Sequence, residues 1–321
     1  MAVKAPVEVV LTPAQREMDS RDWSFGGTWP YEPRWLFTDG IRLHYVDEGP
    51  RDGEPVVMLH GNPTWAYLYR NFIAPVADEG YRVVAHDELG FGRSDKPKRQ
   101  REYSIQRHVS HFGALMDELG LDGVTLVVQD WGGPIGLAWA VDNPGRVARL
   151  VLLNTFTGSA PPGMEAPLVF KLIRAPGTGE LLAKGAHAFV RRLLFKEGIA
   201  HPERLGEHER AAYLAPHPSW DSRTGVLAYP RLIAFTEQSP TRRLADHIEA
   251  GLGALADKPV LICWAMQDPA FRAEALAMWR HRFPAADVHE LPDASHYLQE
   301  DAHEEIVPLL LEFLGRTEHP T

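Results

Sequence analysis

Cysteine is nearly missing from this sequence of 321 residues: Cys263 is the only one, and it lies in an apolar run. A single thiol cannot form an internal disulfide, so the fold must depend on its hydrophobic core, and Cys263 is expected to be a buried structural residue. No group of cysteines and histidines has the spacing of a zinc site, and the fifteen histidines are scattered. The sequence therefore predicts a cytoplasmic protein without a bound metal.

Positive charge is also in short supply. Lysine and arginine number 33 against 43 aspartates and glutamates, which gives a formal net charge of −10. Such a chain repels phosphate groups, so nucleic acid and an anionic membrane surface are not expected as partners. No apolar segment approaches the roughly 20 residues needed to cross a bilayer, and the first residues lack the pattern of a secretion signal. We expect small molecules as partners, and association into a homo-oligomer stays open.

Repeats and low-complexity tracts are absent as well, and the composition is that of a globular protein, 45% hydrophobic and 24% charged. Apolar runs of strand length alternate with helix-length segments, which is typical of a parallel sheet covered by helices on both faces. The first two strands should form a hairpin, because Asp39-Gly40 joins them. The expected strands are 35–38, 41–46, 56–60, 82–86, 124–128, 149–154, 259–265 and 286–291.

The alternation stops near Thr157 and resumes after Pro230. Between them the pattern is helical and is broken repeatedly by proline and glycine. We predict an α/β main domain in two parts, 34–156 and 231–316, with a helical cap, 157–230, inserted over the carboxyl edge of the sheet, where ligands bind in such folds. Residues 1–33 are an N-terminal extension to which we assign no function.

A carboxylate occupies the most informative position of the chain. The apolar strand 124–129 ends at Asp130, a turn of small residues follows, and 134–140 has the pattern of a packed helix. This strand–turn–helix context is that of a nucleophile elbow, which places its residue at the top of the sheet. An aspartate there can attack carbon directly and form an ester, without a base to remove a proton from it.

Two further residues follow later strands in the order nucleophile, acid, histidine. Asp268 comes shortly after the strand 259–265, and His296 comes shortly after the last strand. The carboxyl ends of parallel strands meet at one edge, so a shared site with Asp130 is expected. Each residue also has a structural explanation: Asp130 as a helix cap, Asp268 as a turn residue before Pro269, and His296 as a surface histidine. The joint pattern favours the catalytic interpretation.

The loop 60–63, His-Gly-Asn-Pro, follows another apolar strand. In this architecture such a loop supplies one backbone donor of the oxyanion hole, here Asn62, and the residue after the nucleophile, Trp131, supplies the other. The loop could equally be a plain β-turn, and Trp131 could serve packing alone. The indole N–H of Trp131 is, however, a donor that never accepts, which suits a developing anion.

These segments together resemble the haloalkane dehalogenases. The resemblance rests on residues 60–64, 87–97, 127–133 and 295–296, and it is weakest in the cap. It implies an α/β-hydrolase fold, with a mostly parallel eight-stranded sheet flanked by helices and carrying a helical cap. It also implies that Asp130 is the nucleophile, His296 the base and Asp268 the acid, with no cofactor.

The resemblance further implies that Asn62 and Trp131 hold the departing halide. One branch of the family takes its acid from a Glu after the preceding strand, but this chain has Asn154-Thr155 there. Another branch uses a cap tryptophan, and no tryptophan occurs between residues 158 and 218. The chain is therefore most similar to the branch that pairs Asn with Trp and places an Asp acid after the later strand.

The implied reaction converts a haloalkane and water to an alcohol and chloride or bromide through an alkyl-aspartyl ester. An apolar cap lining would exclude water; its candidates are Leu168, Val169, Phe170, Leu172, Phe189, Leu193 and Leu194. Epoxide hydrolysis is the nearest alternative and would need a tyrosine acid from the cap, for which Tyr213 and Tyr229 are the candidates. A non-catalytic binding protein of the same fold and a coelenterazine-type luciferase are the remaining alternatives.

Overall fold

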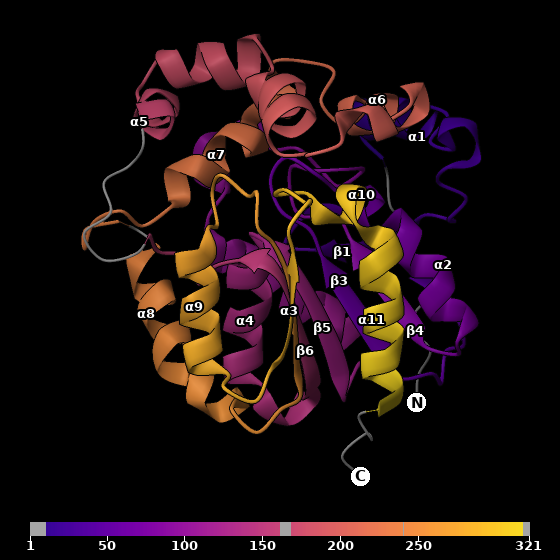
Figure 1. The fold of residues 1–321 in the computed structure, drawn as a ribbon. Coiled ribbons are helices and arrows are strands. Elements are labelled where there is room, and N and C mark those ends of the chain that lie inside the picture. Colours follow the sequence, from indigo (N-terminus) through magenta and orange to yellow (C-terminus); the bar gives the residue numbers. More distant parts are fainter. Residues whose placement is uncertain (1–10, 161–167, 240, 317–321) are drawn as a thin grey trace.

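The computed structural model describes residues 11–160, 168–239 and 241–316, and the chain folds around one sheet (Figure 1). The strands lie in the order β1-β2-β4-β3-β5-β6-β7-β8. This eight-stranded sheet confirms the predicted fold class, and each strand lies within two residues of its predicted bounds. The strands are β1 (Arg34–Thr38), β2 (Ile41–Glu48), β3 (Pro55–Leu59), β4 (Arg82–His86), β5 (Val124–Asp130), β6 (Val147–Thr155), β7 (Val260–Ala265) and β8 (Asp287–Leu291).

The hairpin β1–β2 and the pair β2–β4 are antiparallel, and every other pair in the sheet is parallel. Asp39 and Gly40 both have positive φ, at 51° and 70°, as a tight hairpin turn requires. The reversal of strand order at β3 leaves β3 and β5 as neighbours at the middle of the sheet. The carboxyl ends of these two strands therefore adjoin, which brings the loop after β3 beside the turn after β5.

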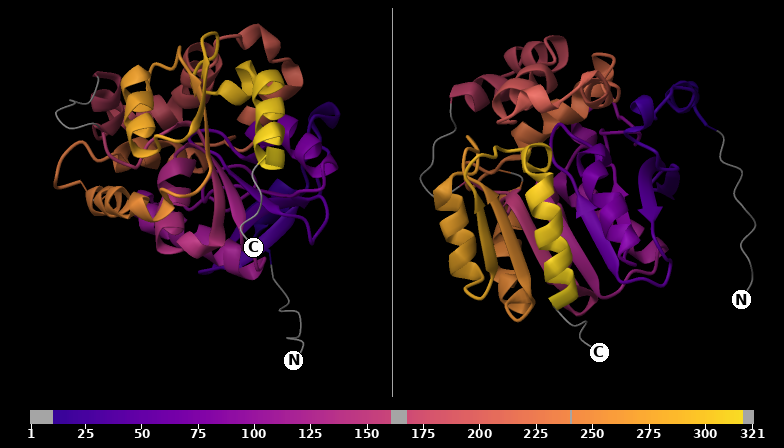
Figure 2. Two further views of the ribbon diagram at one scale, coloured as in Figure 1. Left: turned by 60° about the horizontal axis from the view of Figure 1, so that its bottom comes forward. Right: turned by 45° about the vertical axis from the view of Figure 1, so that its right-hand side comes forward.

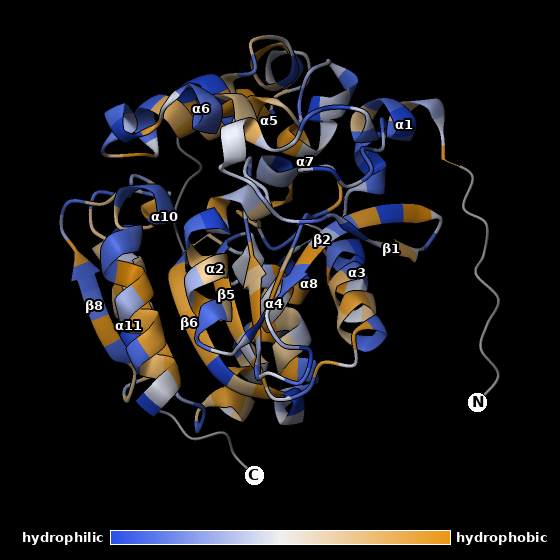
Figure 3. Ribbon diagram, turned by 90° about the vertical axis from the view of Figure 1, so that its right-hand side faces the viewer, coloured by the Kyte–Doolittle hydropathy of each residue, from blue (hydrophilic) through white to orange (hydrophobic). Residues whose placement is uncertain are grey.

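Helices cover both faces of the sheet. Figure 1 shows α2 (Arg70–Asp78) and α11 (His303–Arg316) on one side, with α4 (Gly132–Asp142), α8 (Arg242–Gly251) and α9 (Ala273–Arg282) on the other. Helix α3 (Ile105–Glu118) packs on α4, and α4 packs on α8. Every residue of β5 and β6 is buried, as expected of parallel strands covered on both faces, and Figure 3 shows these inner strands as mostly hydrophobic.

The helical segments between β6 and α8 lie over the carboxyl ends of the strands (Figures 1 and 2). They are α5 (Leu168–Arg174), the π-helical η5 (Glu180–Gly185) and η6 (Phe189–Glu197), α6 (Glu207–Leu214) and α7 (Thr224–Leu232). We call these five elements the cap. Helix α7 continues two residues past the predicted cap boundary at 230, and residues 161–167 of that predicted segment lie outside the described part of the chain. The domain boundaries themselves remain a prediction.

The predicted cap lining is wrong for three residues. Leu168, Val169 and Leu172 of α5 are exposed, whereas Phe189 and Leu194 are buried. Helix α5 packs against α7 and buries only Ile173 among its own residues, so its other side faces outward. An apolar residue in a short helix does not by itself reveal which side is covered, and this is why the sequence pattern misplaced these three.

The lead-in contains α1 (Pro13–Asp19), which is tied to the sheet because Asp19 pairs with Arg42 of β2 at 2.7 Å. Cys263 is buried in β7, as predicted. Within the described ranges no helix is both long and apolar enough to cross a membrane. The remaining short helices are α10 (Leu298–Asp301), η1 (Phe25–Gly27), η2 (Ala66–Tyr69), η3 (Gln100–Glu102), η4 (Pro144–Arg146), η7 (Pro202–Arg204), η8 (Asp221–Arg223) and η9 (Leu252–Leu255).

Candidate active site

Asp130 lies on a sharp turn between β5 and α4. Its φ of +48° is in the left-handed region, which a non-glycine residue adopts only when the surrounding structure holds it there. Two neighbouring glycines allow this close packing: a Cβ at Gly61 would collide with the Asp130 carboxylate, and one at Gly132 would collide with the carbonyl oxygen of Leu59. The turn therefore presents the carboxylate at the carboxyl edge of the sheet, against the loop after β3.

Backbone donors hold the Asp130 carboxylate. The N–H of Asn62 donates to Oδ1 at 2.8 Å, and the N–H of Trp131 also bonds the carboxylate. Burial raises the pKa of Asp130 above its ordinary value, although His296 and these two N–H groups oppose the rise. The same donors would stabilise an oxyanion formed at this carboxyl group, so the geometry suits attack on an ester of Asp130.

His296 lies between the two carboxylates. Its Nδ1 is 2.9 Å from Asp268 Oδ2, and its Nε2 is 3.9 Å from Asp130 Oδ2. Burial alone would lower the pKa of His296, but Asp268 and Asp130 together outweigh burial, and the net shift is upward. This arrangement leaves Nε2 facing the candidate nucleophile, while Nδ1 is fixed by the second carboxylate, so a water between Nε2 and an ester of Asp130 would meet a base.

Asp268 is buried, which alone would raise its pKa, yet its partners outweigh burial and the net shift is downward. Besides His296, its carboxylate accepts from the backbone N–H groups of Ala270 and Phe271, at 2.7 and 3.1 Å. It also accepts from Asn154 Nδ2 at 2.9 Å. The carboxylate is thus kept ionised, which stabilises a positive charge on the imidazole.

Two polar residues of the site were not identified from the sequence. Asn154, at the end of β6, bonds Asp268 and also accepts from the N–H of Ala265, so it links the ends of two neighbouring strands. Gln129 Nε2 donates to the backbone oxygen of His296 at 3.1 Å. Their position at strand ends was the available signal, but their partners depend on which strands are neighbours in the sheet.

Asn62 and Trp131 lie on either side of the Asp130 carboxylate, because the backbone N–H of each donates to it. Asn62 Nδ2 donates to the backbone oxygen of Val226 in the cap at 3.3 Å. The Trp131 ring makes edge-to-face contacts with Phe156 and Tyr229, at centroid distances of 5.1 and 5.0 Å. Both rings pack against Trp131, and Asp130 and Trp131 are buried, at 8% and 3% exposure. In such surroundings an N–H donor attracts an anion more strongly than it does in water.

Comparison with known proteins shows which family the chain belongs to. A model described as the alpha/beta hydrolase fold matches residues 54–303. The chain belongs to the α/β-hydrolase family. Two curated relatives are each 36% identical: a haloalkane dehalogenase of Mycolicibacterium paratuberculosis, over 95% of this chain and 98% of the relative, and a cis-3-alkyl-4-alkyloxetan-2-one decarboxylase of Shewanella oneidensis, over 90% of each. The match to the dehalogenase confirms the resemblance to haloalkane dehalogenases.

Solved structures support the assignment of this chain to the α/β-hydrolase family. A tetrameric haloalkane dehalogenase of Paraglaciecola agarilytica superposes with a TM-score of 0.78 at 26% identity, covering 95% of this chain and 98% of that one. The likeness extends over the main domain and the cap together. It shows that the helical insertion, where the motifs are weakest, still belongs to the same architecture.

The two tyrosines expected of an epoxide hydrolase have other partners in this α/β-hydrolase. The Tyr213 hydroxyl donates to Glu300, on the short helix after His296. The Tyr229 hydroxyl lies 3.0 Å from His108 Nδ1, which itself contacts Glu88 at 2.8 Å. Each hydroxyl bonds another side chain and neither is hydrogen-bonded to Asp130, so the arrangement does not favour epoxide hydrolysis.

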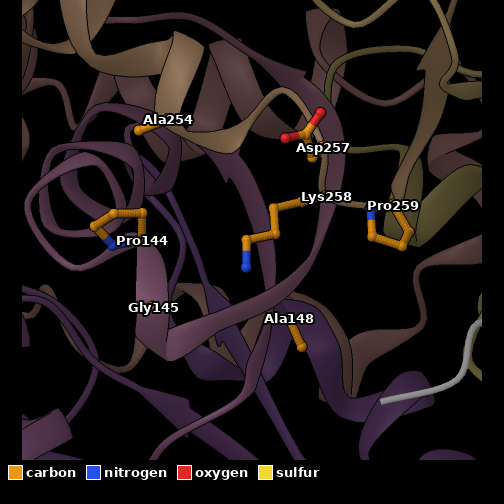
Figure 4. Close-up of a pocket in the computed structure, with 7 residues that line it drawn as sticks. All are labelled: Pro144, Gly145, Ala148, Ala254, Asp257, Lys258 and Pro259. Carbon is orange, nitrogen blue, oxygen red and sulfur yellow. The ribbon is translucent and has the colours of Figure 1, made fainter. Parts of the chain in front are cut away.

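A separate cavity of about 420 Å³ is lined by seven residues that Figure 4 labels, and it lies at the amino ends of the α/β-hydrolase strands. Pro144 and Ala148 line it where β6 begins, and Lys258 and Pro259 line it where β7 begins. The candidate catalytic residues follow the carboxyl ends of the strands, whereas this cavity is at their amino ends. It takes no part in the chemistry considered below.

Proposed function

We propose that this protein hydrolyses haloalkanes to an alcohol and a halide ion through a covalent ester on Asp130. The observation that carries the proposal is the carboxylate of Asp130, placed between two backbone N–H groups and facing His296 Nε2 at 3.9 Å. A serine at this position would indicate acyl transfer. A carboxylate needs no proton removed from it and displaces a leaving group from saturated carbon.

In the first step, an oxygen of Asp130 forms a bond to the carbon that carries the halogen, and the carbon–halogen bond breaks with its electron pair leaving on the halide. The Asn62 side-chain amide and the Trp131 indole N–H donate to that departing anion. The surrounding rings of Phe156 and Tyr229 exclude water, which strengthens both interactions.

In the second step, His296 removes a proton from a water molecule, and the resulting hydroxide attacks the carbonyl carbon of the ester. The backbone N–H groups of Asn62 and Trp131 stabilise the tetrahedral oxyanion. Asp268 stabilises the imidazolium, and Asn154 holds Asp268 in place. The bond from the carbonyl carbon to the alkyl oxygen then breaks, and the departing alkoxide takes the proton from His296 and leaves as the alcohol. The carboxyl group of Asp130 loses its remaining proton to solvent, which regenerates the carboxylate. No cofactor takes part in either step.

The direct test is halide release from 1-bromobutane by the purified protein. We expect turnover that is lost by about 10⁴-fold or more in Asp130→Ala, because that substitution removes the attacking group itself. The exposed Asp257→Ala, at the opposite end of the sheet, is the matched control and should retain full turnover. Formation of a diol from an epoxide, with no halide release from a panel of short haloalkanes, would instead favour the epoxide hydrolase.

A second candidate function follows from the decarboxylase relative. An oxetan-2-one is a four-membered lactone, and Asp130 could open it at the saturated ring carbon, with the carboxylate as leaving group. Loss of CO₂ would then form a C=C bond as Asp130 is expelled. This route consumes no water, so it needs no base at His296. Halide release dependent on His296 supports the dehalogenase, whereas alkene and CO₂ from a cis-3,4-dialkyl-oxetan-2-one would support the decarboxylase.

Two coarser properties belong with this proposal. A homo-oligomer is proposed on the strength of the tetrameric relative, and its state can be measured by light scattering on the eluted protein. A cytoplasmic location is proposed from the single free cysteine, which is buried and needs no oxidising compartment.

A further inference from the structure

Helix α7 of the cap carries a proline inside its length, at Pro230. In an α-helix, the N–H of residue i+4 bonds the carbonyl oxygen of residue i. Proline has no N–H, so the carbonyl of Val226, four residues earlier, loses its partner within the helix. Both residues are buried, and an unpaired carbonyl oxygen is costly there because no water replaces the missing donor.

The donor that reaches this carbonyl comes from the main domain. Asn62 Nδ2 donates to the Val226 oxygen at 3.3 Å. Asn62 is also the residue whose backbone N–H binds the Asp130 carboxylate. The carbonyl that α7 leaves unbonded therefore lies close to the candidate nucleophile. Its donor is Asn62, which with Trp131 forms the leaving-group pair, the two residues proposed to hold the departing halide.

This contact decides which end of the Asn62 amide faces which way. A side-chain amide has a donor end and an acceptor end of nearly the same shape, and its orientation follows from its hydrogen bonds. Rotating the amide by half a turn would place Oδ1 against the Val226 oxygen, acceptor against acceptor. In the orientation observed, Oδ1 has no partner within the described chain, and Nδ2 keeps a second hydrogen for another acceptor.

We propose that Pro230 is a positioning residue for the leaving-group site: by freeing the Val226 carbonyl, it fixes the Asn62 amide with an N–H available for the departing halide. This inference rests on the proposed function for the identity of the anion. Pro230 itself donates nothing to the anion in this account. It acts through the carbonyl oxygen of Val226, because any other residue at position 230 would donate its own backbone N–H to that oxygen.

A positioning role and a purely structural role for Pro230 predict different changes in melting temperature when the proline is replaced. A proline inside a helix lowers helix stability, so replacing it by a residue with an N–H should leave the melting temperature unchanged or higher when the buried volume is kept. The restored N–H would take the Val226 oxygen and release the Asn62 amide. A more stable protein that binds halide less well is the signature of positioning.

The test compares Pro230→Val, which keeps most of the buried volume, and Pro230→Ala with Pro308→Ala. Pro308 is an exposed proline inside α11, which is outside the cap, so its replacement restores an N–H in a helix other than α7. The bromide dissociation constant is measured by quenching of tryptophan fluorescence. Values of kcat and KM are measured with 1-bromobutane, and the signal of the Asn62 side-chain amide is followed by ¹⁵N–¹H NMR. The melting temperature of each variant reports its stability.

We expect both Pro230 variants to bind bromide about fivefold more weakly, the worth of one hydrogen bond, with kcat/KM reduced by a similar factor and the Asn62 amide signal displaced. Pro308→Ala should match the parent protein in bromide affinity, in kcat/KM and in the position of the Asn62 amide signal. Unchanged bromide affinity with a displaced Asn62 signal would overturn the inference, as would an unmoved Asn62 signal in a folded Pro230→Val.

The proposed function and this inference fail separately. If the parent protein released no halide from any substrate, the proposed function would fall. The NMR comparison would still report whether Pro230 sets the orientation of Asn62, because it is made on the free protein. If Pro230→Ala did not fold, Pro230→Val would carry the same comparison.

Discussion

At the scale of single residues, the surroundings of the two site carboxylates shift their pKa values in opposite directions. Burial raises the pKa of Asp130 against the opposing effect of His296 and two backbone N–H groups, whereas His296 and the N–H groups of Ala270 and Phe271 outweigh burial and lower the pKa of Asp268. A carboxylate that is incompletely solvated is the more reactive nucleophile, and one that is fully hydrogen-bonded is the better permanent partner for an imidazolium. The proposed division of roles between Asp130 and Asp268 follows from these environments.

The raised pKa of His296 predicts a pH dependence for the hydrolysis of the ester. The imidazole must be neutral to remove a proton from water, so the rate is full above its pKa and is lost as pH falls through it. Because Asp268 raises the pKa of His296 from its ordinary value, kcat should fall as the pH is lowered through the neutral range. A pH series with 1-bromobutane measures it, and a kcat that stays constant from pH 7.5 down to pH 5 would contradict the assignment.

Much of the site could be predicted residue by residue, because each candidate follows a strand. Asp130, Asp268 and His296 lie at such positions, and the sheet brings them within reach of one another. Asn154 could not be predicted as a partner of Asp268, since this depends on β6 and β7 being neighbours. The bond from Asn62 to Val226 depends on how the cap sits on the sheet, which no local pattern records.

At the scale of elements, the cap is the region where the structure differs most from what the sequence pattern predicts. Segments η5 and η6 are π-helical, a geometry rare enough that periodicity of 3.6 residues does not anticipate it. Between them His187 has a φ of +54°, unusual for a residue with a side chain. The strands, by contrast, were predictable because continuous apolar runs of four to eight residues are typical of a buried parallel sheet. Cap helices have weaker patterns, since α5 buries only Ile173 and α6 buries only Ala212 and Tyr213.

The cap holds two buried histidines that predict how acid affects it. His187 and His217 have rings 5.8 Å apart, and burial, together with nearby cations, lowers the pKa of His187 to about 4 and that of His217 well below its ordinary value. The cations are Arg191 and Arg223 at His187, and Lys96 at His217. A depressed histidine pKa contributes stability that is full above about 6.5 and is lost as pH falls below it.

We therefore expect amide hydrogen exchange in the cap, corrected for intrinsic rates, to accelerate between pH 7 and pH 5 relative to exchange in the central sheet. His187→Gln, which cannot be protonated, should weaken that acceleration, and His281→Gln, at an exposed position on α9, should not. Equal acceleration in the cap of both variants and the parent would contradict the prediction.

At the scale of the whole molecule, the reversal of strand order places chemistry from distant segments at one edge. The loop after β3, the turn after β5 and the segments after β7 and β8 contribute Asn62, Asp130, Asp268 and His296, which span most of the chain. The sheet holds these positions rigidly, and the cap closes over them (Figure 2). Rigid placement matters because displacement requires an aligned approach of the carboxylate to carbon, and a small error of position costs much of the rate.

The whole account depends on the covalent ester, and trapping it is the most direct measurement. His296→Phe removes the base for hydrolysis but leaves Asp130 and the leaving-group pair, so incubation with 1-bromobutane should leave one butyl group per chain, located on Asp130 by mass spectrometry of the digested protein. The double variant Asp130→Ala/His296→Phe is the control and should remain unmodified. No butyl group on His296→Phe, or one on a residue other than Asp130, would contradict the account.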